Sequence, residues 1–149
     1  MRFDHDRAQA LHENMFAPLN RPSGVDAQQL VRAIQEVMSP VGNSIYLHKD
    51  RIQSALDSIL EIKSRLPELS AGDWHYLAAC NEVHSMVLSA EMFFRASLFR
   101  EESRGWFLRE DFPEMDNANW LKWIVVQDQE GEMSLSTDDV PIRNYPLKP

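Results

Sequence analysis

Three stretches of the chain place apolar residues at the spacing of an amphipathic α-helix. The first begins near Asp26, whose side chain can accept from the free amides of a first turn, and Gln29 stands at capping-box spacing from it. The apolar positions that follow form one stripe: Leu30, Val31, Ile34, Val37 and Met38. Ser39-Pro40 and Gly42 are expected to end this helix, because proline lacks the amide that a further turn requires.

Two further helices are predicted on either side of Pro67. The second starts after the Asn43-Ser44 pair and carries its charged residues largely off an apolar stripe, which consists of Ile45, Ile52, Leu56, Ile59, Ile62 and Leu66. The third follows a capping-box spacing, Ser70 and Asp73, and runs without Gly or Pro to about Ser103. Apolar residues cover so much of its circumference that it must bury more than one side. Two partner helices supply part of that cover, which predicts a three-helix antiparallel, spectrin-repeat-like bundle.

The remaining residues divide the chain into three predicted regions. Residues 1–22 mix charged and apolar positions and are interpreted as a lead-in, either a short helix or extended chain. Residues 23–105 form the bundle, and residues 106–149 form an extended, turn-rich tail. The predicted fold class is therefore mainly α, with a tail that follows the three helices.

A β-hairpin is predicted inside the tail, at about residues 121–137. Two short strand-like runs flank the turn-forming segment Asp128 to Gly131, and Gly131 can supply a positive φ at the turn. After the hairpin, three prolines predict an extended C-terminal end: Pro141, Pro146 and Pro149.

Composition restricts the protein classes that fit this chain. Of its 149 residues, 44% are hydrophobic and 26% are charged, which is the balance of a soluble globular domain. The formal net charge of −8 disfavours binding to nucleic acid. No apolar run approaches the roughly 20 residues of a transmembrane helix, and the polar N-terminus lacks a secretory signal. We therefore expect a cytoplasmic protein, which partner subunits could hold at a membrane surface.

The residues that usually carry metal or nucleophilic chemistry are sparse. The single cysteine, Cys80, excludes an internal disulfide and lies in an apolar helical run, where it is interpreted as a small buried hydrophobe. The histidines do not show the spacing of metal ligands: His5, His12, His48, His75 and His84. An independent enzyme that uses His75, His84 or Cys80 therefore has little support, and no metal site is assigned.

No catalytic or cofactor-binding residue is assigned either. The chain has five glycines and contains neither G-x-G-x-x-G nor a phosphate-binding loop, so it is not expected to bind a dinucleotide alone. Adjacent carboxylates such as Glu110-Asp111 diverge on a helix or strand and do not make an acid–base couple.

The charged residues after the third helix have two interpretations. Glu101 and Glu102 add negative charge where the helix dipole is unfavourable, so positive groups such as Arg100, Arg104 or Arg109 are expected to be held against them. An ion-pair network that fixes the third helix to the tail is favoured over a substrate-binding role, because structural networks often resemble sites. Glu102, Arg104, Arg109 and Asp111 are therefore structural candidates.

Aromatic residues gather in the third helix and the tail, where Trp106 and Trp120 are candidate interface residues. The tail could fold back over the bundle and bury these rings. Alternatively, the rings could form an apolar docking surface for another domain or subunit, or for a second copy of the chain in a homo-oligomer. The sequence leaves both interpretations open.

One ordered pattern resembles a known family. It comprises Asn81-Glu82-Val83, Glu91-Met92, Arg95-Ala96, Arg100-Glu101-Glu102-Ser103-Arg104-Gly105, Arg109-Glu110-Asp111-Phe112-Pro113-Glu114 and Asn119-Trp120-Leu121-Lys122. The pattern is similar to the C-terminal domain of fumarate reductase and succinate dehydrogenase flavoprotein subunits, whose superfamily includes L-aspartate oxidase and the adenylylsulfate reductase α subunit. A weaker match covers roughly Pro18 to Val140. Phe107 departs from the family, which more often has histidine there, and so does the segment Val83-His84-Ser85-Met86.

The resemblance implies a three-helix bundle and extended tail that pack against a flavin domain. In that family the flavin and the substrate-binding residues belong to the preceding domains, so FAD is expected in a missing flavin domain or partner. The implied partners are an iron–sulfur subunit and that flavin-binding domain or subunit. The isolated chain is expected to act as a scaffold and to be inactive alone. The alternative is a free-standing helical interaction module derived from the family.

Overall fold

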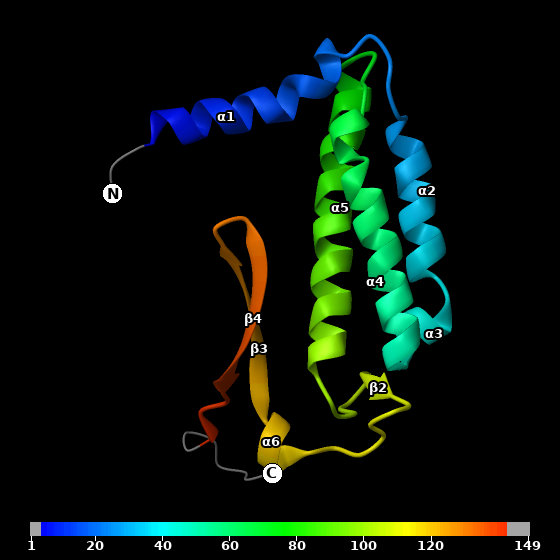
Figure 1. The fold of residues 1–149 in the computed structure, drawn as a ribbon, viewed down its shortest axis with the longest axis vertical. Coiled ribbons are helices and arrows are strands. Elements are labelled where there is room, and N and C mark those ends of the chain that lie inside the picture. Colours follow the sequence, from blue (N-terminus) through cyan, green and yellow to red (C-terminus); the bar gives the residue numbers. More distant parts are fainter. Residues whose placement is uncertain (1–3, 143–149) are drawn as a thin grey trace. The chain divides into compact units, whose positions relative to one another are not determined.

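The computed structural model describes residues 4–142 and confirms the mainly α fold class (Figure 1). The helices are α1 (His5–Phe16), α2 (Ala27–Met38), α3 (Val41–Ser44), α4 (Lys49–Ser64), α5 (Trp74–Phe99) and α6 (Asn117–Trp120), with 3₁₀ turns at Ala17–Asn20 and Leu66–Glu68. The strands are β1 (Tyr46–Leu47), β2 (Leu108–Arg109), β3 (Lys122–Gln129) and β4 (Glu132–Asp139). Strands β1 and β2 pair in parallel, while β3 and β4 form an antiparallel hairpin.

The chain divides into two compact units, and α4 and α5 contribute residues to both. The first unit comprises the described residues up to Val37 together with Ser58–Ala90. The second unit comprises Met38–Asp57 and the described residues from Glu91 onward. The predicted family pattern from Arg100 to Lys122 therefore lies wholly within the second unit.

In the first unit, segments of α2, α4 and α5 lie side by side and alternate in direction (Figure 1). Apolar residues of these helices form one buried core together with Leu69 and Ala71 from the segment before α5: Ala27, Leu30, Ile34, Ile59, Ile62, Leu69, Ala71, Leu77, Cys80, Val83, Val87 and Ala90. Burial of such side chains contributes about 25 cal/mol for each Å² of apolar surface removed from water. Cys80 belongs to this core, and its burial, followed by the charge of Asp26, raises the pKa of its thiol.

Side-chain caps fix where the helices of the first unit begin. Asp26 accepts from the amide of Gln28 at 3.0 Å, just before α2. Asp73 accepts from the amides of His75 and Tyr76 at 2.8 and 3.1 Å, so Asp73 itself caps α5. The capping-box spacing in the sequence had suggested Ser70 for that role.

The segment that contains Ser70 is extended because it pairs with the chain before α2. The amide of Ser70 donates to the Val25 carbonyl at 3.1 Å, and the Val25 amide donates to the Glu68 carbonyl at 2.9 Å. Gly24 permits this approach, since a Cβ there would lie 2.2 Å from the Glu68 oxygen.

Most of the described lead-in is helical, comprising α1 and the 3₁₀ turn at Ala17–Asn20. Asp4 accepts from the amide of Arg7 at 3.0 Å and caps α1, which decides between the two predicted alternatives for His5–Phe16. Among these described residues of α1, none is buried. No helix within residues 4–142 is long and apolar enough to cross a membrane.

Two predicted helix boundaries were wrong, both in the second unit. The second helix was expected directly after Asn43-Ser44, but α4 starts at Lys49 because β1 pairs with β2 in the register Tyr46–Leu108 and Leu47–Arg109. The third helix was expected to reach about Ser103, but α5 ends at Phe99.

The hairpin is confirmed, with strands from Lys122 to Asp139. Glu130 and Gly131 form its two-residue turn with φ of 56° and 91°, values that match the right-handed twist of the strands. The predicted positive φ at Gly131 is therefore present. Pro141 follows β4, whereas Pro146 and Pro149 lie outside the described residues.

Candidate functional site

The carboxylate of Glu102 is the centre of a buried cluster in the second unit. Its side chain is 0% exposed. Arg104 donates to it from two nitrogens, Nε at 2.8 Å and a terminal nitrogen at 2.9 Å. Arg100 donates to the same carboxylate, and the backbone amide of Asp116 donates at 2.9 Å. Every oxygen of this buried anion is therefore held by a donor, as burial of a charge requires.

The ionisation of Glu102 follows from a competition between burial and these donors. Burial alone would raise the pKa of the carboxyl, because a low dielectric disfavours the charged form. The hydrogen bonds from Arg104, the Asp116 amide and Arg100 outweigh that effect and hold the pKa of Glu102 below its usual range. Glu102 is consequently a fixed anion at neutral pH and a poor proton donor.

A second buried pair, Arg109 and Asp111, joins two helix ends. The guanidinium of Arg109 is 2% exposed and donates to the carbonyls of Ser97 and Arg100 at the C-terminal end of α5. Its other nitrogens donate to Asp111 at 2.8 and 2.6 Å. Asp111 also accepts from the amide of Lys49 at 3.3 Å, at the start of α4. The pair therefore satisfies groups that two helix ends leave without partners.

This arrangement explains why α5 stops at Phe99. The carbonyls that would continue the helix ladder accept from Arg109, so the chain can turn away without losing hydrogen bonds. The hydrogen bonds from Arg109 also lower the pKa of Asp111 to about 2, against a partial opposing effect of burial. Asp111 is thus charged over the whole physiological pH range.

Ser103 organises the backbone between these two pairs. Its hydroxyl accepts from the amide of Arg109 at 2.8 Å and lies 2.9 Å from the carbonyl of Phe112, to which it can donate. A hydroxyl that is buried and bonded in this way is not an activated nucleophile, because no base contacts it. Ser103, the residue near which the third helix was expected to end, lies in the middle of the cluster.

Beyond Ser103 the chain makes a tight turn that carries Trp106. The backbone of Arg104 and Phe107 exchanges hydrogen bonds at 2.8 and 3.0 Å, and Gly105 takes the positive φ of 59° that the turn needs. The indole of Trp106 is 90% exposed at the tip. It therefore stands outside the cluster, on a turn whose base is fixed by the buried Glu102–Arg104 pair.

Trp120, unlike Trp106, packs against other side chains. Its ring packs edge-on against Phe99 with centroids 5.8 Å apart, and the Arg100 guanidinium lies 5.5 Å from its centroid. Arg100 also donates to the carbonyls of Trp120 and Lys122 at 3.1 and 2.8 Å. In this part of the tail the chain folds back onto the end of α5, which was one of the two predicted roles for the aromatic residues.

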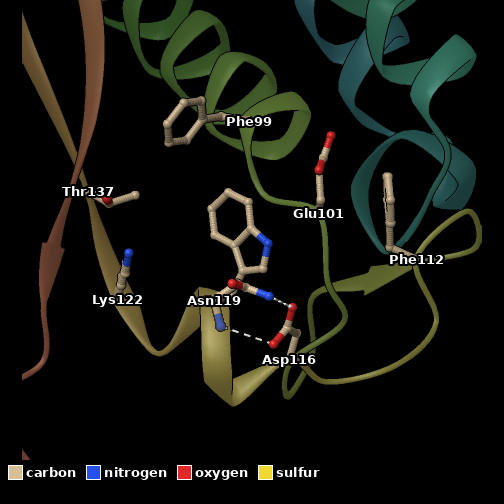
Figure 2. Close-up of a pocket in the computed structure, with 8 residues that line it drawn as sticks. Phe99, Glu101, Phe112, Asp116, Asn119, Lys122 and Thr137 are labelled. Atoms are coloured by element: carbon tan, nitrogen blue, oxygen red, sulfur yellow. Dashed lines mark hydrogen bonds between the residues drawn. The ribbon is translucent and has the colours of Figure 1, made fainter.

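A shallow groove of about 630 Å³ lies beside Trp120 in the second unit. Figure 2 shows Phe99 from the end of α5, Lys122 and Thr137 from the hairpin, and Asp116 hydrogen-bonded to Asn119. The carboxylate of Asp116 is committed to capping α6. Lys122 and Glu101 also line the groove, which thus offers one charge of each sign and an open aromatic wall, without a convergent set of polar groups.

The cluster has the composition of an active site but its groups are already engaged. Within residues 4–142, no buried side-chain nitrogen or oxygen lacks a hydrogen-bond partner. In the same described part, no three histidine, cysteine or acidic side chains gather where they could hold a metal ion. The chemical effect of the arrangement is to stabilise the buried charges of Glu102 and Arg109 and to fix the backbone that follows α5.

The described glycines also do not fit a bound flavin. A dinucleotide pyrophosphate needs glycines at a strand-to-helix turn where backbone amides are accessible. Gly24 is filled by the Glu68 carbonyl, and a Cβ at Gly42 would meet the Arg51 side chain at 3.1 Å. Gly105 and Gly131 occupy turns next to strands, and Gly72 lies ahead of the Asp73 cap of α5.

The structure brings five of the six candidate residues together. Glu102, Arg104, Arg109, Asp111 and Trp120 all belong to the packed end of α5 and the adjoining tail, whereas Trp106 projects from it. Sequence reasoning missed Ser97 and Ser103, whose roles arise from contacts formed by the fold.

Arg51 was missed for the same reason. It donates to the Tyr46 carbonyl at 2.7 Å and to Glu110 at 2.8 Å. Its charge lies off the apolar stripe of α4, a pattern that is equally typical of a solvated surface. Only the two adjacent acidic residues Glu110-Asp111 in the tail hinted that more than one basic partner would be required.

Comparison with known proteins gives a consistent result. The family described as fumarate reductase flavoprotein C-term matches residues 31–149. An uncharacterised FAD-dependent oxidoreductase of Methanocaldococcus jannaschii is 32% identical over 84 residues, 56% of this chain and 15% of the relative. One of the subunits of the CoM/CoB fumarate reductase of Methanothermobacter marburgensis is 34% identical over 76 residues, 51% of this chain and 13% of the relative.

A solved structure shares the fold. Adenylylsulfate reductase from Archaeoglobus fulgidus superposes with a TM-score of 0.83 at 22% identity, over 93% of this chain and 25% of that chain. This chain therefore spans about a quarter of that structure's chain, and at most 15% of the two curated relatives.

Proposed function

Because this chain belongs to the family of fumarate reductase flavoprotein C-terminal domains, we propose that it serves as the scaffolding and interface domain of a flavin-dependent oxidoreductase. In this proposal the chain supplies no group that reacts with the substrate. It provides a rigid surface on which the catalytic part of the enzyme packs. The acceptor would be fumarate, or a related substrate that the flavin-binding part selects.

The observation that carries this proposal is that the charged side chains of the family motif are already hydrogen-bonded within the chain. Glu102 and Arg109 are almost inaccessible to solvent and are bonded to other parts of the same unit. A substrate-binding arginine needs a free face toward its ligand, whereas these guanidiniums are directed at helix ends and at carboxylates. Their arrangement supports a structural role for the motif.

The partners follow from the same proposal. FAD would be bound by a flavin domain or subunit outside this chain, and electrons would reach it through an iron–sulfur subunit. The complex would be cytoplasmic, or attached to a membrane surface through its other subunits. Trp106 is the residue we expect to contact the flavin-binding partner, because exposed tryptophans on rigid turns are typical interface anchors.

Two measurements test this assignment. The purified full chain should lack the visible absorption band of a flavin and should not reduce fumarate with a reduced dye as electron donor. Affinity purification of the tagged chain from its own cells should recover a yellow complex that does reduce fumarate. A flavin band or reductase activity in the isolated chain would disprove the scaffold role.

A matched pair of variants tests the proposed contact. Trp106→Ala should reduce recovery of the flavin-containing complex, while Trp74→Ala should not, although Trp74 is also exposed at 69%. Neither ring contributes to the buried core, so both variants are expected to keep the helical circular dichroism of the wild type. Equal recovery with both variants would remove Trp106 from the interface.

A further inference from the structure

The hairpin has strand edges that no other described strand covers. Among residues 4–142, the sheet formed by β3 and β4 contains only these two strands. None of its described residues, 122–139, is buried. A two-stranded hairpin is marginally stable in water, and an open strand edge can accept another strand.

The turn determines which backbone groups face outward. Glu130 and Gly131 form a two-residue loop with positive φ at both positions, so Gln129 and Glu132 form the first hydrogen-bonded pair of the ladder. Hydrogen-bonded and non-hydrogen-bonded pairs then alternate along an antiparallel ladder. The odd-numbered residues of β3 therefore bond to β4, and the even-numbered residues direct their amides and carbonyls away from it.

One end of this outer edge of β3 is already covered. The carbonyl of Lys122 accepts from Arg100 at 2.8 Å, as an outward-facing carbonyl should. Within the described residues 4–142, the outward backbone groups of Ile124, Val126 and Asp128 make no such contact and form the open part of the edge.

The sequence of β3 is complementary to itself about Val125. If a second copy lies antiparallel with Val125 opposite its own counterpart, Ile124 falls opposite Val126 of that copy. Both residues belong to the outward-facing series, so they can form hydrogen-bonded pairs. In the same register Lys122 falls opposite Asp128 of the second copy, and opposite charges on facing strands attract.

The outer edge of β4 lacks this property. An antiparallel pairing of two copies of β4 about Leu135 would set Glu132 opposite Asp138 of the other copy. Like charges directly opposite one another are unfavourable. In these registers the two edges of the same hairpin differ, because only the pairing of β3 sets opposite charges against each other.

We infer that two copies of this chain associate through the outer edges of β3, antiparallel about Val125, into a four-stranded sheet. Such a pairing is isologous, since the same residues contribute from both copies, and it joins strands by main-chain hydrogen bonds. In the four-stranded sheet the half-buried apolar faces of the two hairpins become one continuous face. In each copy this face consists of Ile124, Val126, Met133 and Leu135. The association goes beyond the proposed scaffold function and does not depend on a flavin partner.

Charge reversal gives the sharpest test. Sedimentation of the full chain from about 1 µM to about 1 mM should show a monomer–dimer equilibrium, as expected for a small interface. Lys122→Asp creates two Asp–Asp contacts across the dimer, and Asp128→Lys creates two Lys–Lys contacts. Each variant alone should dimerise at least about tenfold more weakly than the wild type.

A mixture of the two variants should associate again, because every contact across the heterodimer then joins an aspartate to a lysine. Hydrogen exchange of the hairpin amides would verify that each variant keeps the hairpin, since Asp128 also accepts from the Gly131 amide at 2.8 Å. Val125→Lys should abolish the dimer, whereas Ser136→Lys, on the same rung of the ladder, should not. A monomeric wild type over the whole range, or a mixture that stays monomeric, would overturn the inference.

Discussion

The end of α5 and the β3–β4 hairpin belong to the same unit but are stabilised in opposite ways. At the end of α5, charged residues are buried and hydrogen-bonded. Glu102, which is 0% exposed, accepts from guanidiniums and an amide, while Arg109, which is 2% exposed, donates to a carboxylate and to carbonyls. In the hairpin, none of the described residues is buried, and its fold depends on a two-residue turn and cross-strand pairs. The comparison shows that the buried charges of the family motif fix the position of the backbone, whereas the described hairpin leaves its outer strand edges without a further strand.

Removal of the central anion should have the largest effect. Glu102→Ala leaves the guanidiniums of Arg100 and Arg104 without their buried partner. We expect a loss of about 3–5 kcal/mol in the free energy of unfolding, measured by urea denaturation. Glu101→Ala, which removes an exposed neighbour, should change it by less than about 0.5 kcal/mol. Equal losses would mean that burial of the motif does not matter.

Loss of the guanidinium fork at Arg109 should have a smaller but clear effect. Arg109→Lys keeps the charge but cannot bond Asp111 at two atoms while also reaching the Ser97 and Arg100 carbonyls. We expect a destabilisation of about 2–3 kcal/mol by urea denaturation. Arg51→Lys is the matched control. The side chains of Arg51 and Glu110 are 41% and 50% exposed, so the change should cost at most about 1 kcal/mol.

The pH dependence of stability should report the Arg109–Asp111 pair. The folded-state pKa of Asp111 is about 2, below its ordinary value of 3.8. Its ionised form therefore stabilises the fold above about pH 4, and this contribution of about 2 kcal/mol is lost as the pH falls through the folded-state pKa. The stability difference between wild type and Asp111→Asn should shrink on acidification from pH 6 toward pH 2. A constant difference would contradict the assignment.

The smallest effect should come from the hairpin turn. Glu130 adopts a φ of 56°, which Asn tolerates better than Glu, so Glu130→Asn should stabilise the hairpin by about 0.5 kcal/mol. Hydrogen exchange should slow for amides of β3 and β4, while amides near Glu102 keep their rates. A global slowing would show that the hairpin and the buried cluster unfold together.

The same contrast explains what the sequence could predict. The hairpin was predictable because its determinants are local: alternating residues flank a turn with glycine at the position of positive φ. The apolar stripes of the helices were predictable for the same reason. The end of α5 was not, because its stop at Phe99 depends on a guanidinium ten residues farther along the chain.

The charged motif was only partly predictable. The sequence indicated that arginines would oppose Glu102, and the structure places Arg100 and Arg104 there. It could not indicate that Arg109 would turn toward α5 and α4, since the short β1–β2 pairing that brings these ends together involves two residues in each strand. Such short pairings leave no periodic pattern in a sequence.

The exposed ring of Trp106 gives the chain a built-in optical reporter. An indole in contact with water emits at longer wavelength and is open to collisional quenchers, and both properties change when a surface closes over it. The turn beneath it is held by the Arg104–Phe107 backbone bonds, so its emission should report contact rather than local unfolding. Difference spectra between the wild type and Trp106→Ala would isolate this emission from that of the other three tryptophans. Binding to this turn could then be followed without any added label.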